Sequence, residues 1–461
     1  MSNYSSSTIC ALATAPGIGA IAIIRLSGAD AITICNKVFN GKDLTKVATH
    51  TIHFGTIRDG DKIVDEVLVS VFKDKNSFTG ENAIEISTHG SPYIQQQVLQ
   101  LLITNGAQSA GPGEFTLRAF LNSKLDLSQA EAVADVIAAN SETSHELAMQ
   151  QMRGGFSNEI QKLRELLINF ASLIELELDF GEEDVEFADR ADLKTLVTKL
   201  NSALTKLITS FDYGNVIKSG VPVAIIGEPN VGKSTLLNAL LNEERAIVSD
   251  IAGTTRDVIE DEINIKGISF RFIDTAGIRE TADTIETLGI EKTFEKIDQA
   301  AIVLLLVDAA TITRAALDKD IKKISDRIAD KNKRLIVIAN KVDAMKDQEG
   351  LLKAFTGIKN VIFTAAKLKD NIIAIEEKLY AYIQTGALNN DVVVTNARHY
   401  EALTKANDSL LKVLQGLDNN ITGDFLAMDI RQALHYLGEI TGDITTDDLL
   451  ENIFSKFCIG K

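Results

Sequence analysis

Residues Gly227–Ser234 carry two glycines, a lysine and a serine in the spacing GxxxxGKS. The segment follows a β-branched apolar run, Val221–Ile226, and precedes a run of helix-forming residues, Thr235–Leu241. Glycines let the backbone curl so that its N–H groups surround phosphate oxygens at the positive end of a helix. In such a loop Lys233 reaches the β- and γ-phosphates and the Ser234 hydroxyl binds Mg²⁺. The sequence therefore predicts a nucleotide site whose contacts in this segment are Asn230, Val231, Gly232, Lys233, Ser234 and Thr235.

A second motif, Asn340–Asp343 (NKVD), ends another predicted strand. The Asp343 carboxylate can accept hydrogen bonds from N1–H and the 2-amino group of guanine, whereas adenine has no matching pair of donors. The nucleotide is therefore expected to be GTP rather than ATP. The expected contacts on the base side are Asn340, Lys341, Asp343, Ala365, Ala366 and Lys367.

The segment between these motifs offers groups for the γ-phosphate and for Mg²⁺. Thr254 and Thr255 fit a switch segment in which one hydroxyl completes the coordination of Mg²⁺. Asp274 follows a predicted strand and can hold the hydration shell of the ion, and Gly277 lets the γ-phosphate approach a backbone N–H. The expected nucleotide contacts of this segment are Thr254, Thr255, Asp274, Thr275, Ala276 and Gly277.

Residues Asp274–Gly277 form a DTAG motif, and the next residue is Ile278. Many GTPases have at this position a glutamine that orients the attacking water. An isoleucine cannot orient water, so another group must do so, and a separate cation must offset the charge of the transition state. The sequence leaves two candidates open for each role. They are Glu280 or Glu286 for the water and Arg256 or Arg279 for the charge.

The elements that must hold these residues indicate a multidomain α/β protein. At 461 residues the chain is long enough for about three domains. Residues 1–121 mix strand-like runs with turn signals, residues 122–217 and 386–461 have helical periodicity, and residues 218–385 alternate β-branched runs with helical patterns. Such alternation predicts a mostly parallel sheet covered on both faces. We therefore expect an N-terminal α/β domain, a helical domain formed from two separate parts, and a Ras-like P-loop G domain inserted between those parts.

Turn and breaker residues set the expected limits of individual elements. Gly154–Gly155 is expected to divide the first helical part into two helices, before a further helix at Ala191–Phe211. A domain boundary is expected at Lys218–Gly220. The predicted strands are Ala20–Arg25, Val67–Phe72, Ala83–Ser87, Val221–Ile226, Ile268–Ile273, Ile302–Val307, Leu335–Ala339 and Val361–Phe363.

Charge and cysteine content narrow the class of protein further. Lys and Arg number 47 against 64 Asp and Glu, and the net charge of −17 disfavours indiscriminate binding to nucleic acid or anionic membrane. Cys10, Cys35 and Cys458 form no CxxC pair, which favours a reducing compartment over a disulfide or zinc scaffold. The first 24 residues lack the cationic start of a secretory signal, and the longest clean apolar run, Ala300–Val307, is too short to span a membrane. A cytoplasmic protein without a membrane segment is expected.

Segments outside the nucleotide motifs resemble the MnmE (TrmE) family of tRNA-modification GTPases of bacteria and organelles. They are Ala11–Gly28, Ser77–Glu85, Gly111–Leu127 and Phe457–Lys461. The resemblance implies an N-terminal domain that forms a homodimer and binds a cofactor of the 5-formyl-tetrahydrofolate type. It further implies action with the flavoprotein MnmG on certain tRNAs. The product is an aminomethyl-type or carboxymethylaminomethyl group at C5 of the wobble uridine, made with a tetrahydrofolate one-carbon unit.

The resemblance also implies which residues bind the folate. The family positions fall on Arg25, Glu85, Lys124 and Lys461. Cations suit the acidic glutamate tail of folate, and the Glu85 carboxylate suits the N–H groups of the pterin edge. Two interpretations of Cys458 stay open: a thiol that takes part in chemistry near the folate, and a cysteine that only packs.

For hydrolysis, the resemblance implies that K⁺ takes the place of an arginine finger and that pairing of G domains accelerates the reaction. The implied K⁺ ligands are Asn230, Ser249, Ile251 and Thr254. The implied Mg²⁺ ligands are Ser234 and Thr255, and Ser249 is also expected to contact the nucleotide. The resemblance implies that Glu286, rather than Glu280, is the carboxylate that orients the attacking water.

Two other functions compete with this one. A regulatory or assembly switch, whose GTP cycle controls binding to another macromolecule without modification chemistry of its own, would have the same nucleotide motifs. A ribosome-assembly GTPase would carry a basic RNA-binding segment, and the acidic composition counts against it. The matches outside Val221–Gly386 favour the modification enzyme, and binding of a folate would separate it from the switch.

Overall fold

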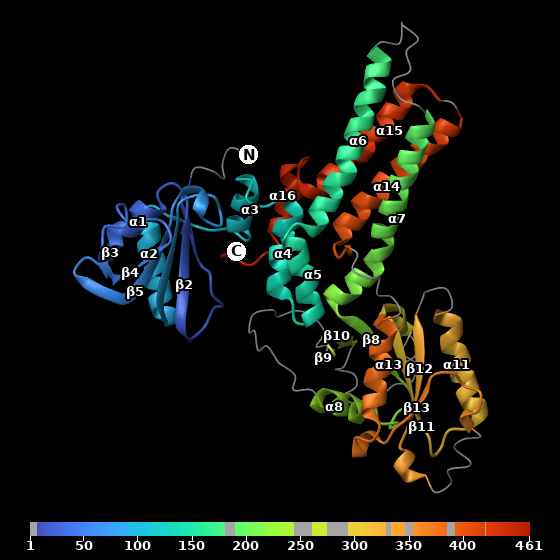
Figure 1. The fold of residues 1–461 in the computed structure, drawn as a ribbon. Coiled ribbons are helices and arrows are strands. Elements are labelled where there is room, and N and C mark those ends of the chain that lie inside the picture. The colour runs from blue at the N-terminus through green and yellow to red at the C-terminus, as the bar shows by residue number, and fades with distance from the viewer. Residues whose placement is uncertain are drawn as a thin grey trace. The chain divides into compact units, whose positions relative to one another are not determined.

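The computed structural model of the chain describes residues 7–179, 190–243, 261–273, 294–328, 333–345, 354–384, 392–419 and 421–461 (Figure 1). They divide into two compact units, one within residues 1–138, 148–205 and 401–461 and the other within residues 139–147 and 206–400. The first unit holds an N-terminal sheet and helices from both flanks of the second unit, and the second holds a mostly parallel sheet. The expected fold class is therefore confirmed, whereas the domain limits at residues 121, 217 and 385 stay predictions.

The N-terminal sheet has the strand order β3-β4-β5-β6-β2-β1-β7 and is antiparallel except for the pair β1 and β7. Because side chains alternate between the faces of a sheet, every second residue of a strand enters the core. Ile24 of β2 and Ile86 of β6 are buried there with helices α1 (Ala31–Val38) and α2 (Pro92–Thr104). The strands are β1 (Ile9–Leu12), β2 (Gly19–Ser27), β3 (Phe39–Asn40), β4 (Thr51–Asp59), β5 (Lys62–Phe72), β6 (Ala83–Gly90) and β7 (Gln108–Ser109).

The face of this sheet opposite α1 and α2 carries exposed apolar side chains. One row across it consists of Phe54, Leu68, Ser87 and Ile23. Within this row Phe54 is 68% exposed and Leu68 is 47% exposed. The adjacent row contains Ser70, Glu85 and Arg25, so two of the predicted folate-binding residues belong to the same face. Contiguous exposed apolar residues of this kind mark interaction surfaces.

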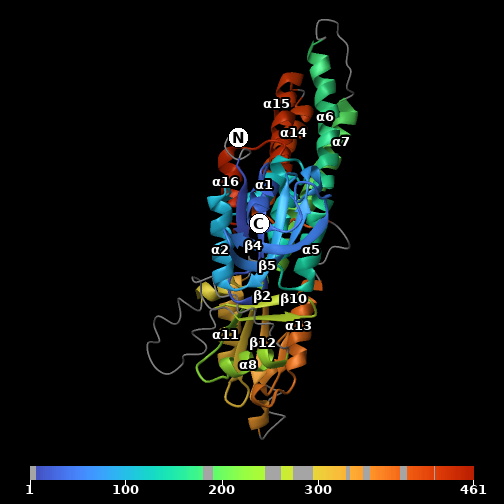
Figure 2. The same cartoon turned by 90° about the vertical axis from the view of Figure 1, so that its left-hand side faces the viewer.

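The helices on the two flanks of the second unit pack against each other. Helix α6 lies beside α15, where Arg431 Nε donates to Glu175 Oε1 at 2.8 Å. Helix α7 lies beside α14, where Asn201 Nδ2 donates to Asn407 Oδ1 at 2.9 Å, and Figures 1 and 2 show these long helices running side by side. None of the helices that the structure describes is long and apolar enough to span a membrane. The helices are α3 (Glu114–Leu121), α4 (Leu127–Ala138), α5 (Glu142–Met152), α6 (Gly155–Asp179), α7 (Arg190–Ser219), α14 (Ala397–Asp418), α15 (Gly423–Thr441) and α16 (Asp447–Phe454).

The first helical part differs from the expectation in two respects. A break at Gly154 separates α5 from α6 as predicted, but a second break separates α4 from α5. Ser141 explains it, because its Oγ accepts a hydrogen bond from the Ser144 backbone N–H at 3.2 Å and so caps the start of α5. The predicted helix at Ala191–Phe211 is also longer, and α7 continues to Ser219 before Gly220 at φ 76° ends it.

The sheet of the second unit has the strand order β13-β12-β11-β8-β10-β9 and is parallel except for the antiparallel pair β9 and β10. Neighbouring residues of β8 enter opposite cores: Val223 packs with α8 and α13, and Ala224 packs with α11. Both faces are therefore covered, as expected of a parallel sheet. The elements are β8 (Val221–Ile226), α8 (Lys233–Glu243), β9 (Asp261–Ile265), β10 (Ile268–Phe272), β11 (Ile302–Asp308), α11 (Arg314–Ile328), β12 (Arg334–Asn340), β13 (Val361–Phe363) and α13 (Ile372–Gln384).

Candidate functional site

The predicted phosphate loop joins the end of β8 to the start of α8. Close approaches require glycine at two positions. A Cβ at Gly227 would lie 2.2 Å from the Leu306 carbonyl oxygen, and a Cβ at Gly232 would lie 2.5 Å from Asn340 Nδ2. Gly227, Gly232 and Asn230 also have positive φ angles, of 152°, 100° and 62°. The loop thus has the curled backbone that lets successive N–H groups surround an anion.

The ammonium group of Lys233 turns back onto this loop. Its Nζ donates to the carbonyl oxygens of Gly227 at 2.7 Å and of Glu228 at 2.9 Å. Burial, together with the neighbouring charge of Lys296, lowers the pKa of Lys233. Phosphate oxygens are stronger acceptors for a cation than carbonyl oxygens are, so a bound phosphate can replace these contacts.

Asn340, at the end of β12, joins the phosphate loop to the base side of the site. Its Nδ2 donates to the Val231 carbonyl oxygen at 2.8 Å, and its Oδ1 accepts from the Ala366 N–H at 3.0 Å. The residue is only 3% exposed, so both hydrogen bonds are protected from water. The first residue of the NKVD motif therefore fixes the loops that carry the other motifs, in addition to any contact with the nucleotide.

The remaining residues on the base side fall into two groups. Lys341, at φ 64°, places its Nζ 2.7 Å from Asp308 Oδ2 at the end of β11. Asp343 lies in a short 3₁₀ turn with its side chain exposed. The side chains of Ala365 and Ala366 are 1% and 3% exposed, so these two residues can offer only backbone groups to a base. Lys367 is exposed.

A cavity of about 330 Å³ runs beside the phosphate loop. Its walls include Gly227–Val231, the end of β11, the segment Thr311–Thr313 and Lys341. Of the predicted contacts in α8, Ser234 is half-buried and Thr235 is exposed.

The part of the predicted site that concerns the switch segments lies outside the described residues. This part comprises Ser249, Ile251, Thr254, Thr255, Arg256, Asp274, Thr275, Ala276, Gly277, Ile278, Arg279, Glu280 and Glu286. Their roles stay predictions.

A second candidate site lies on the N-terminal sheet, where Arg25 faces Glu85. Arg25 Nη2 and Nε donate to Glu85 Oε1 at 2.8 and 3.0 Å. The guanidinium carbon lies 6.0 Å from the ring centre of Phe78 and 5.7 Å from that of Phe115. A cavity of about 260 Å³ opens beside this pair, and its walls include Phe78 and His50. Aromatic walls with a guanidinium and a carboxylate can hold a flat ring that has a hydrogen-bonding edge.

The last residues of the chain approach this second site through their backbone. The Phe115 N–H donates to the main-chain oxygen of Lys461 at 3.1 Å, and Arg25 Nη1 donates to the Gly460 carbonyl oxygen at 3.5 Å. Lys124 does not line the cavity, and its Nζ donates at 2.9 Å to a backbone carbonyl oxygen in the loop before β6. The structure therefore brings Arg25, Glu85 and the backbone at Lys461 together, whereas Lys124 contacts Lys75, next to the cavity-lining Asn76.

The three cysteines differ in their capacity for thiol chemistry. Burial raises the pKa of Cys10 to about 11 and that of Cys35 to about 12. Cys458 is exposed, and its carbonyl oxygen accepts from the Gly113 N–H at 3.3 Å. Cys458 is thus the cysteine that solvent and ligands can reach, and its role stays open.

Sequence reasoning missed three residues of these sites. Asp308, which pairs with Lys341, had no signal beyond its place at the end of a strand. Phe78, which lines the cavity beside Arg25, lies inside a recognised segment but was given no role. Arg118 is 2% exposed and ion-paired to two carboxylates, and a cation inside the mostly apolar stretch Phe115–Phe120 of α3 was the signal that could have found it.

Comparison with known proteins gives the family of the chain. A family model described as GTP-binding protein TrmE N-terminus matches residues 8–124, and one described as MnmE helical domain matches residues 127–458. The tRNA modification GTPase MnmE of Christiangramia forsetii is 58% identical over an alignment of 472 positions, which covers 98% of this chain and 99% of that protein. The proteins of the same name from Cytophaga hutchinsonii and Parabacteroides distasonis are 54% and 51% identical, covering 98% and 99% of this chain and 98% and 100% of those proteins. The chain therefore belongs to the MnmE family of tRNA modification GTPases.

Proposed function

We propose that this GTPase uses the site at Gly227–Ser234 to hydrolyse GTP while it acts with MnmG on tRNA. The reaction installs an aminomethyl-type or carboxymethylaminomethyl group at C5 of the wobble uridine. The observation that carries the proposal is the pair of hydrogen bonds made by Asn340, at 2.8 Å to Val231 and 3.0 Å to Ala366, because they bind the phosphate loop and the base side into one site. Similarity along 98% of the chain supports the tRNA-modifying role.

Mg²⁺ and K⁺ are the proposed metal cofactors. Ser234 and Thr255 would hold Mg²⁺, and Asn230, Ser249, Ile251 and Thr254 would hold K⁺. Of these, Asn230 and Ser234 lie among the described residues, and their oxygen donors sit in and directly after the curled phosphate loop, which fits hard cations. When bound, the two cations supply the positive charge that offsets the charge developing on the transferred phosphoryl group.

A folate of the 5-formyl-tetrahydrofolate type is the proposed cofactor of the N-terminal site. The Arg25–Glu85 pair and the Phe78 ring at the cavity suit the edge and face of a pterin, and Lys124 and Lys461 are the cations proposed to meet an acidic tail. When bound, the folate supplies a one-carbon unit. This cavity favours a modification enzyme over a GTP-driven assembly switch, which has no need of a folate.

The apolar row on the N-terminal sheet is the proposed homodimer surface. Phe54 and Leu68 are exposed on the face that also holds Arg25 and Glu85. A two-fold interface places the same patch of both copies against each other, which suits a self-complementary apolar row. Pairing through this face would bring the two folate sites of the dimer to the interface.

Replacement of Asp343 by asparagine tests the guanine assignment. The amide can no longer accept both hydrogen bonds from N1–H and the 2-amino group, so the affinity for GTP is expected to fall by about a hundredfold or more. Xanthosine triphosphate has a 2-oxo group that the amide N–H can meet, and its affinity is expected to rise. Fluorescent-nucleotide titrations measure both changes, and an unaltered preference for GTP would contradict the assignment.

The Glu286→Ala substitution tests the water-orienting role. Turnover of GTP is expected to fall by about 10²-fold or more, because an alanine cannot position water, while GTP affinity stays near that of the parent. The matched control is Glu280→Ala, which is expected to retain turnover. An equal loss of turnover in both variants would contradict the assignment of the water-orienting role to Glu286.

The monovalent cation in the buffer tests the K⁺ site. GTP turnover in KCl is expected to exceed turnover in NaCl at the same ionic strength by about a hundredfold or more, because a cation in the place of an arginine finger offsets the charge of the transition state. An Asn230→Ala variant should lose most of that difference. Equal rates in the two salts would instead favour Arg256 or Arg279 as the charge partner.

The Phe54→Asp substitution tests the dimer surface. A carboxylate in the apolar row would lose its hydration on burial in the interface, so the dissociation constant is expected to rise by about thirtyfold or more. Phe425→Asp on α15 is the control, because Phe425 is 58% exposed and lies on the helical part. Sedimentation or light scattering reports the mass of each variant, and a Phe54→Asp protein that stays dimeric would exclude this face.

A further inference from the structure

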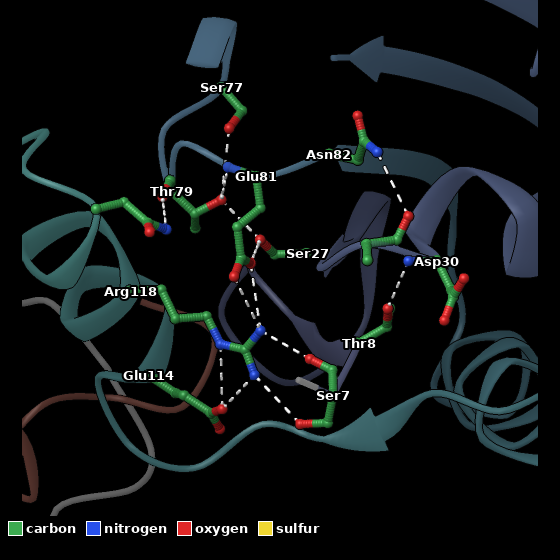
Figure 3. A network of polar contacts seen from close by, with 12 residues as sticks. Ser7, Thr8, Ser27, Asp30, Ser77, Thr79, Glu81, Asn82, Glu114 and Arg118 are labelled. Carbon is green, nitrogen blue, oxygen red and sulfur yellow. Dashed lines mark hydrogen bonds and ion pairs between the residues drawn. The ribbon is translucent and has the colours of Figure 1, made fainter. Parts of the chain in front are cut away.

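Arg118 is a buried cation in α3 that the proposed chemistry does not use. It is 2% exposed, and its guanidinium is shared between two carboxylates. Nη2 donates to Glu114 Oε1 at 2.8 Å and Nη1 donates to Glu81 Oε2 at 3.2 Å, while Nη1 also donates to the Ser7 carbonyl oxygen at 2.8 Å (Figure 3). Burying a guanidinium is unfavourable unless its N–H donors are hydrogen-bonded, so Arg118 needs these partners to stay buried.

One of those partners belongs to a loop without regular structure, Ser77–Asn82, which precedes β6. Glu81 Oε2 also accepts from Ser27 Oγ at 2.7 Å, and Ser27 Oγ lies 2.6 Å from Thr79 Oγ1 (Figure 3). From the other side, Asn122 Nδ2 donates to the Thr79 carbonyl oxygen at 2.7 Å. Two side chains therefore hold the loop in place: Arg118 of α3, which binds Glu81, and Asn122, which follows α3 and binds Thr79. Arg118 lies at the centre of this network.

Phe78 is carried by this loop between two buried neighbours. Ser77 is 7% exposed and Thr79 is 1% exposed, whereas Phe78 is 42% exposed and lines the cavity beside Arg25. The network buries the polar residues on both sides and leaves the aromatic ring directed to the cavity. Any shift of the loop would move the ring away from Arg25, whose guanidinium carbon lies 6.0 Å from its centre.

We infer that Arg118 is a positioning residue that holds the Ser77–Asn82 loop, and through it the Phe78 ring, in place to stack on the flat ring of a pterin-type ligand. The inference rests on the proposed folate site for its ligand, but the position of the loop is a property of the chain itself. Arginine suits this task better than lysine, because its planar fork reaches Glu114, Glu81 and Ser7 at once, whereas an ammonium is a compact point charge.

The chain contains no tryptophan, which gives a direct readout of the ring position. A Phe78→Trp variant would carry a single tryptophan at the cavity. The comparison is between this reporter alone, the reporter with Arg118→Lys, and the reporter with Arg164→Lys. Arg164 is the matched control, because it lies on α6 and is ion-paired to Asp443, with a side chain 19% exposed and no part in the cavity.

Without any folate, Arg118→Lys is expected to raise the acrylamide quenching constant of the reporter by about twofold and to lower its fluorescence anisotropy, because the loop is no longer held. Arg164→Lys is expected to change neither. With 5-formyl-tetrahydrofolate, the dissociation constant read from tryptophan quenching is expected to rise about tenfold for Arg118→Lys, the effect of losing one charge-assisted hydrogen bond. Unchanged quenching and anisotropy in Arg118→Lys, or equal changes in Arg164→Lys, would overturn the positioning role.

The two readouts separate this inference from the proposed function. If the reporter protein and the parent chain bind no folate in an independent calorimetric titration, the folate proposal fails, and the ligand-free fluorescence still decides the role of Arg118. If Arg118→Lys is insoluble, Glu81→Gln removes one carboxylate of the network and is expected to give the same loosening of the reporter. A Glu81→Gln protein with a fully held reporter would contradict the inference.

Discussion

A phosphate-binding loop must keep its backbone N–H groups free to bind the anion. These groups therefore cannot form the backbone hydrogen bonds that fix the shape of a helix or strand. In this GTPase the restraint comes from the buried amide of Asn340, which accepts from Ala366 and donates to the Val231 carbonyl oxygen. The rest of the nucleotide site depends on that amide, because it keeps segments more than a hundred residues apart in register. Gly232 is glycine for the same reason, since a Cβ would lie 2.5 Å from Asn340 Nδ2.

The N-terminal site uses the same physical solution with a different side chain. Its loop Ser77–Asn82 has no regular structure, and a single buried group with several donors, Arg118, anchors it from an adjacent helix. In both sites a loop carries part of the proposed ligand contacts, and a buried polar side chain holds that loop through its hydrogen bonds. A network of this kind rigidifies a loop only when every member is satisfied.

The nucleotide motifs, the strands of the parallel sheet and the discontinuous helical part could all be predicted, because each follows from local residue types or from periodicity. The break before α5 could not, because it depends on a side-chain bond between Ser141 and Ser144 that competes with an otherwise continuous helical pattern. The sequence also could not predict ion pairs between distant residues, such as Asp308 with Lys341 or Arg118 with Glu81. Nothing in the spacing of these residues along the chain indicates that they meet. The roles assigned to the switch residues stay predictions.

The packing of α6 on α15 and of α7 on α14 has a consequence during synthesis. The earlier helices leave the ribosome well before their partners, and the whole G domain must be translated in between. Until then their apolar faces have no native cover, and contacts of such long sequence separation form slowly. Each residue inserted between the two flanks therefore lengthens the interval in which α6 and α7 stay without their partner helices.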